Sequence, residues 1–124
     1  MHHIHLFVPD AQAAQAWYVK NFGAAAGKRG AFDTANVPGA EIAFIKTDMR
    51  QSPTKVRSVD HIGFEVRDID AFVRKLESAG VPIETPIRNS ANAANLRIAY
   101  ILDPWGTYIE LTQGLAPAQQ AAIR

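Results

Sequence analysis

The sequence predicts an α+β domain made of two paired βαβββ modules, which form a cupped, barrel-like mixed sheet with the helices outside. The first observation is a repeat: an aliphatic stretch, an aspartate, a helical stretch and a glycine occur in the same order twice. Fifty-eight residues separate His3 from His61, and the same number separates Asp10 from Asp68. A repeat of this length is too long for a solenoid turn and fits a duplicated supersecondary module.

The second observation is the hydrophobic pattern of the first copy. Residues 3–8 are mostly aliphatic, aromatic or histidine, which favours a strand. Asp10 stands where a helix N-cap belongs, and Gly23 stands where the helix over 11–22 would end in a left-handed residue. Three short strands are then expected, at 24–28, 30–37 and 41–47, with Pro38-Gly39 as a turn between the last two.

The second copy repeats this order. A strand from His61 leads to Asp68, a helix over 69–79 and then Gly80. Strands are expected at 82–87, 96–102 and 108–112, and Asp103-Pro104-Trp105-Gly106 fits a type I turn. We therefore divide one domain, 1–124, into module 1 (about 1–48), a polar linker (about 49–58), module 2 (about 59–113) and a tail (114–124) that we expect to form a short helix.

Composition restricts the function classes. The chain has 124 residues, 48% hydrophobic and 20% charged, which suits one globular domain. Scattered charges that sum to +1 argue against a nucleic-acid partner, and no apolar run is long enough to cross a membrane. We find no secretory signal and expect a cytoplasmic protein. The expected partners are a small molecule and a second copy of the chain, because a domain of this size leaves sheet edges to cover.

Histidines and carboxylates provide the candidate metal ligands, because the chain has no cysteine. Because side chains alternate along a strand, His3 and His5 share one face of the first strand. On the last strand Glu110 shares a face with Tyr108 and Thr112. If the modules pack around a pseudo-twofold axis, His3 and His61 become equivalent. With Glu110 they then form a facial site that leaves positions open for substrate. Taken singly, each of these residues is more often solvated than a ligand, and the repeat favours the metal site.

These residues resemble the vicinal oxygen chelate superfamily, which includes glyoxalase I, extradiol dioxygenases and bleomycin-binding proteins. The resemblance extends from His3 to Thr112, and its most specific part is Asp103-Pro104-Trp105-Gly106 followed by Ile109-Glu110-Leu111. It implies a divalent metal (Fe²⁺, Mn²⁺, Zn²⁺ or Ni²⁺) and a substrate that binds the metal through adjacent oxygens. It also implies that the metal ligands are His3, His61 and Glu110.

One difference from the family pattern reduces the number of subfamilies that the chain resembles. Glyoxalase I carries a fourth ligand on the last strand of module 1, but aligning 41–46 with the end of module 2 sets Phe44 opposite Glu110. A three-ligand site resembles extradiol dioxygenases and fosfomycin thiol transferases. The latter carry an arginine shortly after the last strand, where this chain has Gln113-Gly114-Leu115, so fosfomycin is a poor candidate substrate. Isomerase or lyase chemistry and ring-cleaving oxygenation both remain open.

His5 is the candidate catalytic residue, because a neutral imidazole beside a metal can carry a proton; the other interpretation is that it only bonds a buried neighbour. Glu65 faces the same side as His61 but lies farther along its strand. A metal-free binding protein of the bleomycin-resistance kind is the alternative function, with the cup as an apolar pocket. The candidate substrate-binding residues are Phe7, Phe44, Tyr100, Trp105 and Tyr108.

Overall fold

The computed structural model describes residues 2–115, and the chain divides into two compact units, Met1–Gln51 and Ser52–Arg124. Each unit holds one strand, one helix and three further strands in that order. The α+β class and the repeated βαβββ order expected from the sequence are therefore confirmed. The short helix expected in the tail lies outside the described residues, apart from 114 and 115. Within the described part of the chain, neither helix has the length and hydropathy needed to span a bilayer.

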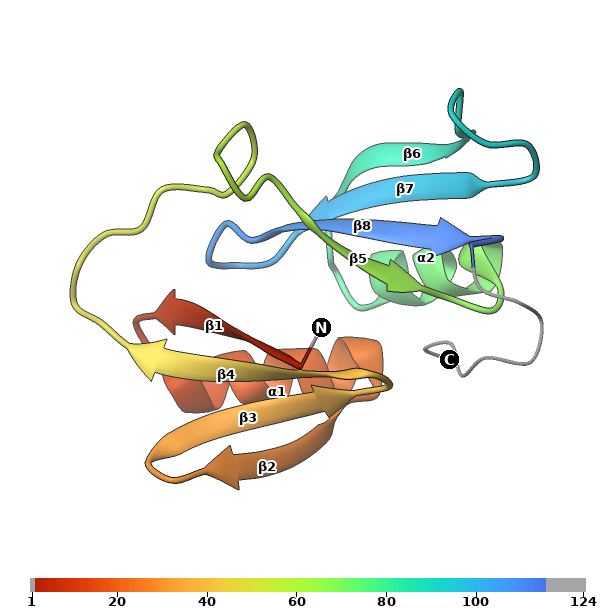
Figure 1. The fold of residues 1–124 in the computed structure, drawn as a ribbon. Helices are drawn as coiled ribbons and strands as arrows, with labels where there is room; N and C mark the ends of the chain where they lie inside the picture. Colours follow the sequence, from red (N-terminus) through yellow and green to blue (C-terminus); the bar gives the residue numbers. More distant parts are fainter. Residues whose placement is uncertain (1, 116–124) are drawn as a thin grey trace. The chain divides into compact units, whose positions relative to one another are not determined.

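Unit 1 consists of β1 (His3–Val8), α1 (Ala11–Phe22), β2 (Ala25–Arg29), β3 (Phe32–Val37) and β4 (Ala40–Lys46). The strands lie side by side in the order β1-β4-β3-β2, with β1 parallel to β4 and the other pairs antiparallel. Figure 1 shows α1 lying along one face of this sheet. We call the opposite face of each sheet, turned away from its own helix, the distal face.

The two faces of β1 differ in chemistry because side chains alternate along a strand. Leu6 and Val8 are buried on the α1 side, where the unit's core also contains Tyr18, Phe22 and Phe44. His3, His5 and Phe7 point to the distal face. Burial of the aliphatic set therefore fixes which way the histidines point, since a slip of one residue would exchange the two faces.

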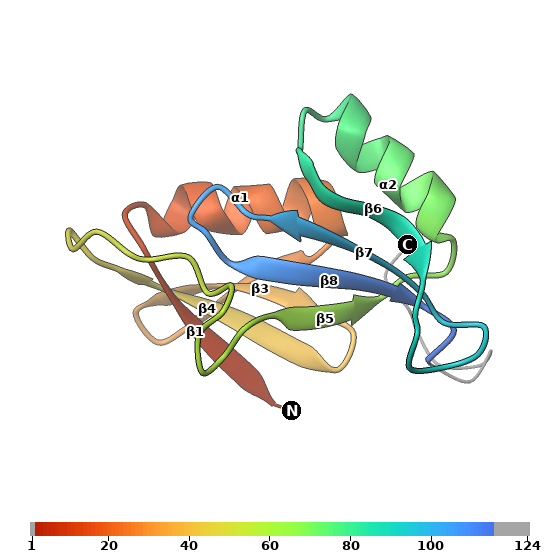
Figure 2. The same ribbon diagram turned by 90° about the horizontal axis from the view of Figure 1, so that it is seen from above.

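Unit 2 consists of β5 (Ile62–Glu65), α2 (Ile69–Ser78), β6 (Ile83–Asn89), β7 (Arg97–Leu102) and β8 (Tyr108–Gln113). The strand order is β5-β8-β7-β6, with β5 parallel to β8, so unit 2 repeats the topology of unit 1. Figure 2 shows these strands in that order, with α2 running beside β6. The fully buried side chains of its core are aliphatic, namely Ile69, Leu76, Ile101, Ile109 and Leu111.

The helix ends follow the sequence pattern. Asp10 accepts a hydrogen bond from the backbone N–H of Ala13 at 3.0 Å, and Asp68 accepts one from Ala71 at 2.9 Å. Gly23 ends α1 with φ +65°, a conformation that glycine adopts without the steric cost other residues meet. The expected bounds of α1 are confirmed, and α2 ends one residue earlier than expected, at Ser78.

The turn over residues 103–106 joins β7 to β8 and is confirmed. The Gly106 N–H donates to the Asp103 carbonyl at 3.1 Å. The Asp103 carboxylate is buried and accepts from the backbone N–H of Trp105 at 2.9 Å and of Thr107 at 2.7 Å. These bonds set the register of the β7–β8 hairpin, in which Tyr100 is the cross-strand partner of Glu110.

Candidate functional site

The distal face of unit 2 brings three polar side chains together. Glu110 lies on β8 between two neighbours, because Gly63 of β5 is its partner on one side and Tyr100 of β7 on the other. Side chains of paired residues in register point to the same face. His61 immediately precedes β5, and its ring reaches Glu110, the cross-strand partner of Gly63.

Glu110 makes one contact with each of its carboxylate oxygens. Its Oε2 lies 3.0 Å from Nε2 of His61, and its Oε1 accepts a hydrogen bond from the Tyr100 hydroxyl at 3.0 Å. Burial, followed by the hydrogen bond to Glu110, raises the pKa of Tyr100 to about 12. Tyr100 therefore remains a donor over the whole range in which the protein would work.

The second ring nitrogen of His61 also meets a carboxylate. Its Nδ1 lies 2.8 Å from Oδ2 of Asp60, and the other oxygen of Asp60 accepts from the backbone N–H of Val56 at 2.5 Å. The hydrogen bond with His61 and then that with Val56 hold the pKa of Asp60 below its usual value, so this carboxyl is ionised and can only accept. The imidazole is thus held at both nitrogens.

Aromatic rings surround this pair. Tyr100 and Tyr108 stack with their ring centroids 4.9 Å apart and their planes at 15°, and the His61 ring stands edge-on to Tyr100 at 5.7 Å. Lys55 lies over the Tyr108 ring, 4.9 Å from its centroid, and pairs with Glu84 on β6. The sequence-predicted residues Tyr100 and Tyr108 are therefore next to Glu110 and His61.

The spacing of His61 and Glu110 suits a divalent metal. Ligand atoms at right angles around an ion, each bonded at about 2.1 Å, lie about 3.0 Å apart, which is the distance between Nε2 and Oε2. Neutral imidazole and carboxylate are the donors that Zn²⁺, Fe²⁺ and Mn²⁺ accept. No group of three histidine, aspartate or glutamate side chains in the described residues is arranged to hold an ion. The pair therefore fits two positions of a metal site that needs a further ligand.

Unit 1 carries a cluster of imidazoles at the start of β1. Nδ1 of His3 lies 2.8 Å from Nδ1 of His2, and the rings of His3 and His5 are 5.1 Å apart. His5 stands edge-on to Phe32, with centroids 5.4 Å apart. Desolvation, and then the charge of Arg29, lower the pKa of His3. A neutral ring is the form of histidine that binds a metal.

The strand register corrects the sequence alignment of the two modules. Ile4 pairs with Ile42, as Ile62 pairs with Ile109, so Ala43 and not Phe44 occupies the position of Glu110. Alanine has no donor atom, so the conclusion that module 1 contributes no ligand there is unchanged. Phe44 points the opposite way: it is 1% exposed and its ring lies 5.5 Å from Tyr18 of α1. Phe44 belongs to the core of unit 1.

The neighbouring carboxylate in module 1 is already paired. Glu41 is the cross-strand partner of His3, and its side chain forms an ion pair with Arg29 of β2.

Phe7 shares the distal face with His3 and is 52% exposed. Trp105 lies in the 103–106 turn, where its backbone N–H donates to Asp103.

Glu65 makes contacts that strand alternation alone did not predict. It lies on the distal face of β5, as expected, and accepts from Thr112 Oγ1 at 2.6 Å and from the backbone N–H groups of Gly114 and Leu115 at 2.8 and 3.1 Å. These bonds fix the chain where it leaves β8. Sequence reasoning missed Asp60, whose only sequence signal is that it directly precedes His61.

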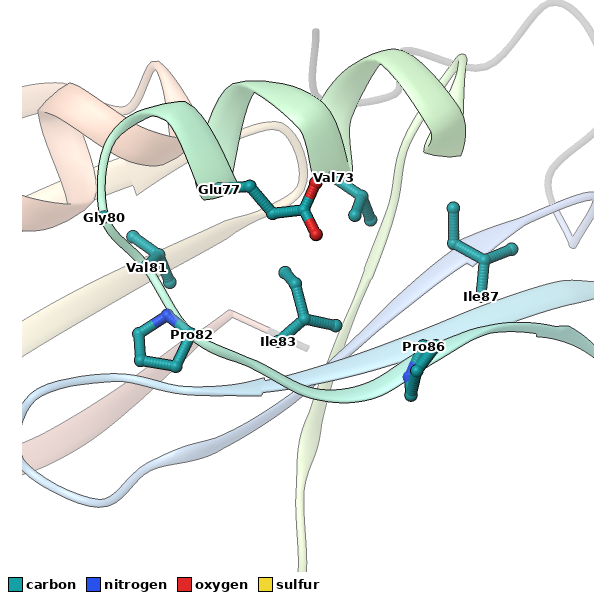
Figure 3. Close-up of a pocket in the computed structure, with 8 residues that line it drawn as sticks. All are labelled: Val73, Glu77, Gly80, Val81, Pro82, Ile83, Pro86 and Ile87. Carbon is teal, nitrogen blue, oxygen red and sulfur yellow. The ribbon is translucent and has the colours of Figure 1, made fainter.

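An apolar groove in unit 2 lies apart from this cluster. It has a volume of about 740 Å³ and runs between α2 and β6. Figure 3 shows Val73 and Glu77 of α2 pointing across the groove toward Ile83 of β6. Ile83 pairs with Ile101, which is buried on the α2 side of the sheet, whereas Glu110 and His61 are on the distal face. The groove therefore does not include the candidate ligands.

Comparison with known proteins shows which family the chain matches. The sequence profile of the Glyoxalase/Bleomycin resistance protein/Dioxygenase superfamily matches residues 1–111. The fosfomycin resistance protein FosX from Listeria monocytogenes has a solved structure that is 23% identical, with a TM-score of 0.73 and 90% of each chain covered. A lactoylglutathione lyase from Agrobacterium tumefaciens is 20% identical, with a TM-score of 0.68 and 92% of each chain covered.

A third solved structure is that of TioX from Micromonospora sp. ML1. It is 20% identical, with a TM-score of 0.70, and the match covers 92% of this chain and 98% of TioX. At these identities the likeness shows a shared fold and nothing finer. No curated protein sequence gives a significant match. The match over residues 1–111 and the repeated βαβββ topology establish that the chain belongs to the Glyoxalase/Bleomycin resistance protein/Dioxygenase superfamily.

Proposed function

We propose that the protein is a metal-dependent enzyme of the glyoxalase/dioxygenase type, acting on a small substrate that binds a divalent ion through adjacent oxygens. The observation that carries this proposal is the 3.0 Å approach of His61 Nε2 to Glu110 Oε2. Two unlike metal-binding atoms converge there, one from β8 and one from the residue directly before β5, beside the aromatic rings of Tyr100 and Tyr108. His3, the third ligand implied by the family resemblance, completes the proposed set.

The residues of this chain have separate tasks in the proposal. A bound divalent ion would supply Lewis acidity that stabilises negative charge developing on the substrate's oxygens. Tyr100 donates to Oε1 of Glu110, so Oε2 is the carboxylate oxygen that would be available to an ion. Tyr100, which is half-buried beside Glu110 with Tyr108 stacked against it, is the first candidate substrate contact, and Tyr108, Phe7 and Trp105 are further candidates.

His5 is the proposed proton carrier. It shares the distal face of β1 with His3, and its ring lies beside the ring of His3. Because the two rings are 5.1 Å apart, His5 lies within the length of one small substrate from an ion held by His3. A proton taken up or given back at its ring nitrogen would serve an isomerase or a lyase, and either chemistry agrees with the site. Ring cleavage at Fe²⁺ is the other subclass that three protein ligands would suit.

A metal-free binding protein is the second candidate function. It is favoured by the observation that a proton shared between His61 Nε2 and Glu110 Oε2 would satisfy the same 3.0 Å contact. The aromatic residues would then line a pocket that sequesters a small molecule. Metal content separates the two candidates, because the binding protein requires none.

Metal titration of variants tests the ligand assignment. The variants His3→Ala, His61→Ala and Glu110→Ala each remove one of the three proposed ligands. Each should therefore weaken the binding of Mn²⁺ or Zn²⁺ by about 100-fold or more. Glu77→Ala is the matched control, because it removes the same side chain from the groove between α2 and β6. Full binding in both His3→Ala and Glu110→Ala would exclude the proposed set.

Replacement of His5 by glutamine separates catalysis from packing. If His5 carries a proton, turnover should fall roughly 10²–10⁴-fold while metal affinity is kept. If His5 only packs against Phe32, stability should fall and turnover should not. Loss of metal affinity in His5→Gln with no change in His3→Gln would show that the wrong histidine of β1 was assigned.

We also propose that the protein is a homodimer, because each four-stranded sheet has edge strands, β1 and β2 in one and β5 and β6 in the other. Sedimentation velocity over a range of protein concentrations tests this. A monomer mass at every concentration would contradict it.

A further inference from the structure

We infer that Asp60 is a positioning residue that fixes the ring orientation and the proton position of His61, so that Nε2 is the nitrogen left free to bind a metal. This inference deepens the proposed function and depends on it for its consequence. Its geometric part, the control of the His61 ring, concerns contacts that exist without a metal.

The first argument is the donor and acceptor count. Nδ1 of His61 lies 2.8 Å from a carboxylate oxygen, which can only accept, so Nδ1 must carry a proton. A neutral imidazole has one donor nitrogen and one acceptor nitrogen, so its Nε2 then has a free lone pair. Oε2 of Glu110 faces Nε2 at 3.0 Å, so a proton on Nε2 would be shared with Glu110, and a bound divalent ion would take the place of that proton. A divalent cation satisfies both atoms at once.

The second argument is competition for the ring proton. Glu110 is also an acceptor, and without Asp60 it would draw the proton of a neutral His61 to Nε2, the position that a metal needs. Asp60 shifts this balance toward Nδ1. Outer carboxylates that hold a ligand histidine in this way commonly contribute 10–100-fold to metal affinity.

The third argument is the way the chain holds Asp60 in place. Thr54 Oγ1 donates to the Asp60 carbonyl at 2.8 Å and accepts from the backbone N–H of Tyr108 at 2.8 Å, while the Thr54 N–H donates to Gly106 at 2.9 Å. Val56, whose N–H donates to the Asp60 carboxylate, has φ +62°. A β-branched residue rarely adopts this left-handed conformation, and it persists only where surrounding contacts fix it. The segment 54–60 is therefore tied to the strand that carries Glu110.

The fourth argument is that module 1 repeats the contact. His2 stands at the position of Asp60 in the 58-residue repeat, and its ring lies 2.8 Å from Nδ1 of His3, as Asp60 lies 2.8 Å from Nδ1 of His61. In both modules the residue before the proposed ligand histidine occupies Nδ1. In both modules Nε2 is the ring nitrogen that this contact does not occupy.

Asp60→Asn tests the inference directly. The asparagine oxygen can still accept from the Val56 N–H, but its NH₂ group would then face Nδ1 of His61 and force the ring proton to Nε2. Long-range ¹H–¹⁵N spectra at a pH of about 8.5, where imidazoles are mostly neutral, report which nitrogen carries the proton. We expect the Nδ1–H form of His61 in the unmodified protein and the Nε2–H form in Asp60→Asn, with no metal added. Asp48→Asn, an equal charge change on an exposed residue, should leave the His61 signals unchanged.

Metal affinity provides the second readout. Asp60→Asn should bind Zn²⁺ about 10–100-fold more weakly than the unmodified protein, and Asp48→Asn should bind it equally well. The same His61 ring form in Asp60→Asn and the unmodified protein would overturn the inference, even if both bind metal. A change of ring form with no metal bound by the unmodified protein would support Asp60's control of the ring and refute the proposed function. If Asp60→Asn does not fold, Asp60→Ser, which leaves Nδ1 without a carboxylate, should likewise lose the Nδ1–H signal, and retention of that signal would also overturn the inference.

Discussion

Replacing Tyr100 by phenylalanine removes a hydroxyl that holds Glu110 and leaves the rest of the ring in place. The hydroxyl donates to Oε1 of Glu110 at 3.0 Å, while the ring stacks on Tyr108 at 4.9 Å. In the variant the stack should persist, but the Glu110 carboxylate becomes free to rotate or to bind an ion through both oxygens. We therefore expect Tyr100→Phe to weaken metal binding without unfolding unit 2.

The size of this effect follows from the kind of bond that is lost. A hydrogen bond to a charged group contributes about 1.5–3 kcal/mol when it is well shielded from water. Tyr100 and Glu110 are both only partly buried, so solvent screening reduces this to about 1 kcal/mol. A loss of about 1 kcal/mol corresponds to a ~5-fold higher dissociation constant for the metal.

Tyr108→Phe is the matched control, because it deletes the same atom from the other ring of the stack and leaves the bond to Glu110 intact. Calorimetric titration of Mn²⁺ or Zn²⁺ into the two variants measures the difference. Equal affinity in both variants would refute the claim that Tyr100 holds Glu110 in position for a metal.

Two further predictions concern stability. Glu65→Ala should lower the free energy of unfolding by about 1–3 kcal/mol, because the Thr112 hydroxyl and two backbone N–H groups lose their acceptor. Its metal affinity should not change. Equal stability of Glu65→Ala and the unmodified protein in urea denaturation would contradict this structural role. Arg97 donates two hydrogen bonds to Asp70 and lowers the pKa of that carboxyl, so this pair stabilises the fold at neutral pH and its contribution should disappear as the pH falls below about 4. Asp70→Asn should therefore be less stable than the unmodified protein at pH 7, with a smaller difference at pH 3, and a difference independent of pH would refute the assignment.

Much of the fold was predictable because the same sequence pattern occurs in both halves of the chain. The two aspartate N-caps, the bounds of α1 and the 103–106 turn each depend on local rules that hold within a few residues. The repeat then indicated that both halves have the same topology. Alternation along β1 and β8 also assigned His3 and Glu110 to distal faces correctly, because burial of the opposite side chains fixes the register.

The alignment of Phe44 with Glu110 failed for a related reason. Unpaired strands can be aligned one residue apart with similar hydrophobic scores, and that slip exchanges the two faces of a strand. The hydrogen-bonded register of β1 with β4 was needed to show that Ala43 occupies the position.

The contacts of Asp60 and Glu65 could not be read from pattern either. Alternation gives the face of a strand residue but not the rotamer of a long side chain or the path of a loop. Asp60 meets Nδ1 of His61 only because Thr54 and Val56 fold back on it. Such contacts are set by loop geometry, which has no periodic signal.

Anomalous X-ray diffraction from crystals grown with Mn²⁺ tests the central claim most directly, because it locates the ion as well as detecting it. The account predicts one anomalous peak for each chain, within about 2.2 Å of both His61 Nε2 and Glu110 Oε2, the two atoms that lie 3.0 Å apart in the structure. The peak should be absent from crystals of Glu110→Ala grown in the same way. A peak that contacts neither residue, or no peak at saturating Mn²⁺, would contradict the claim that this pair binds a metal.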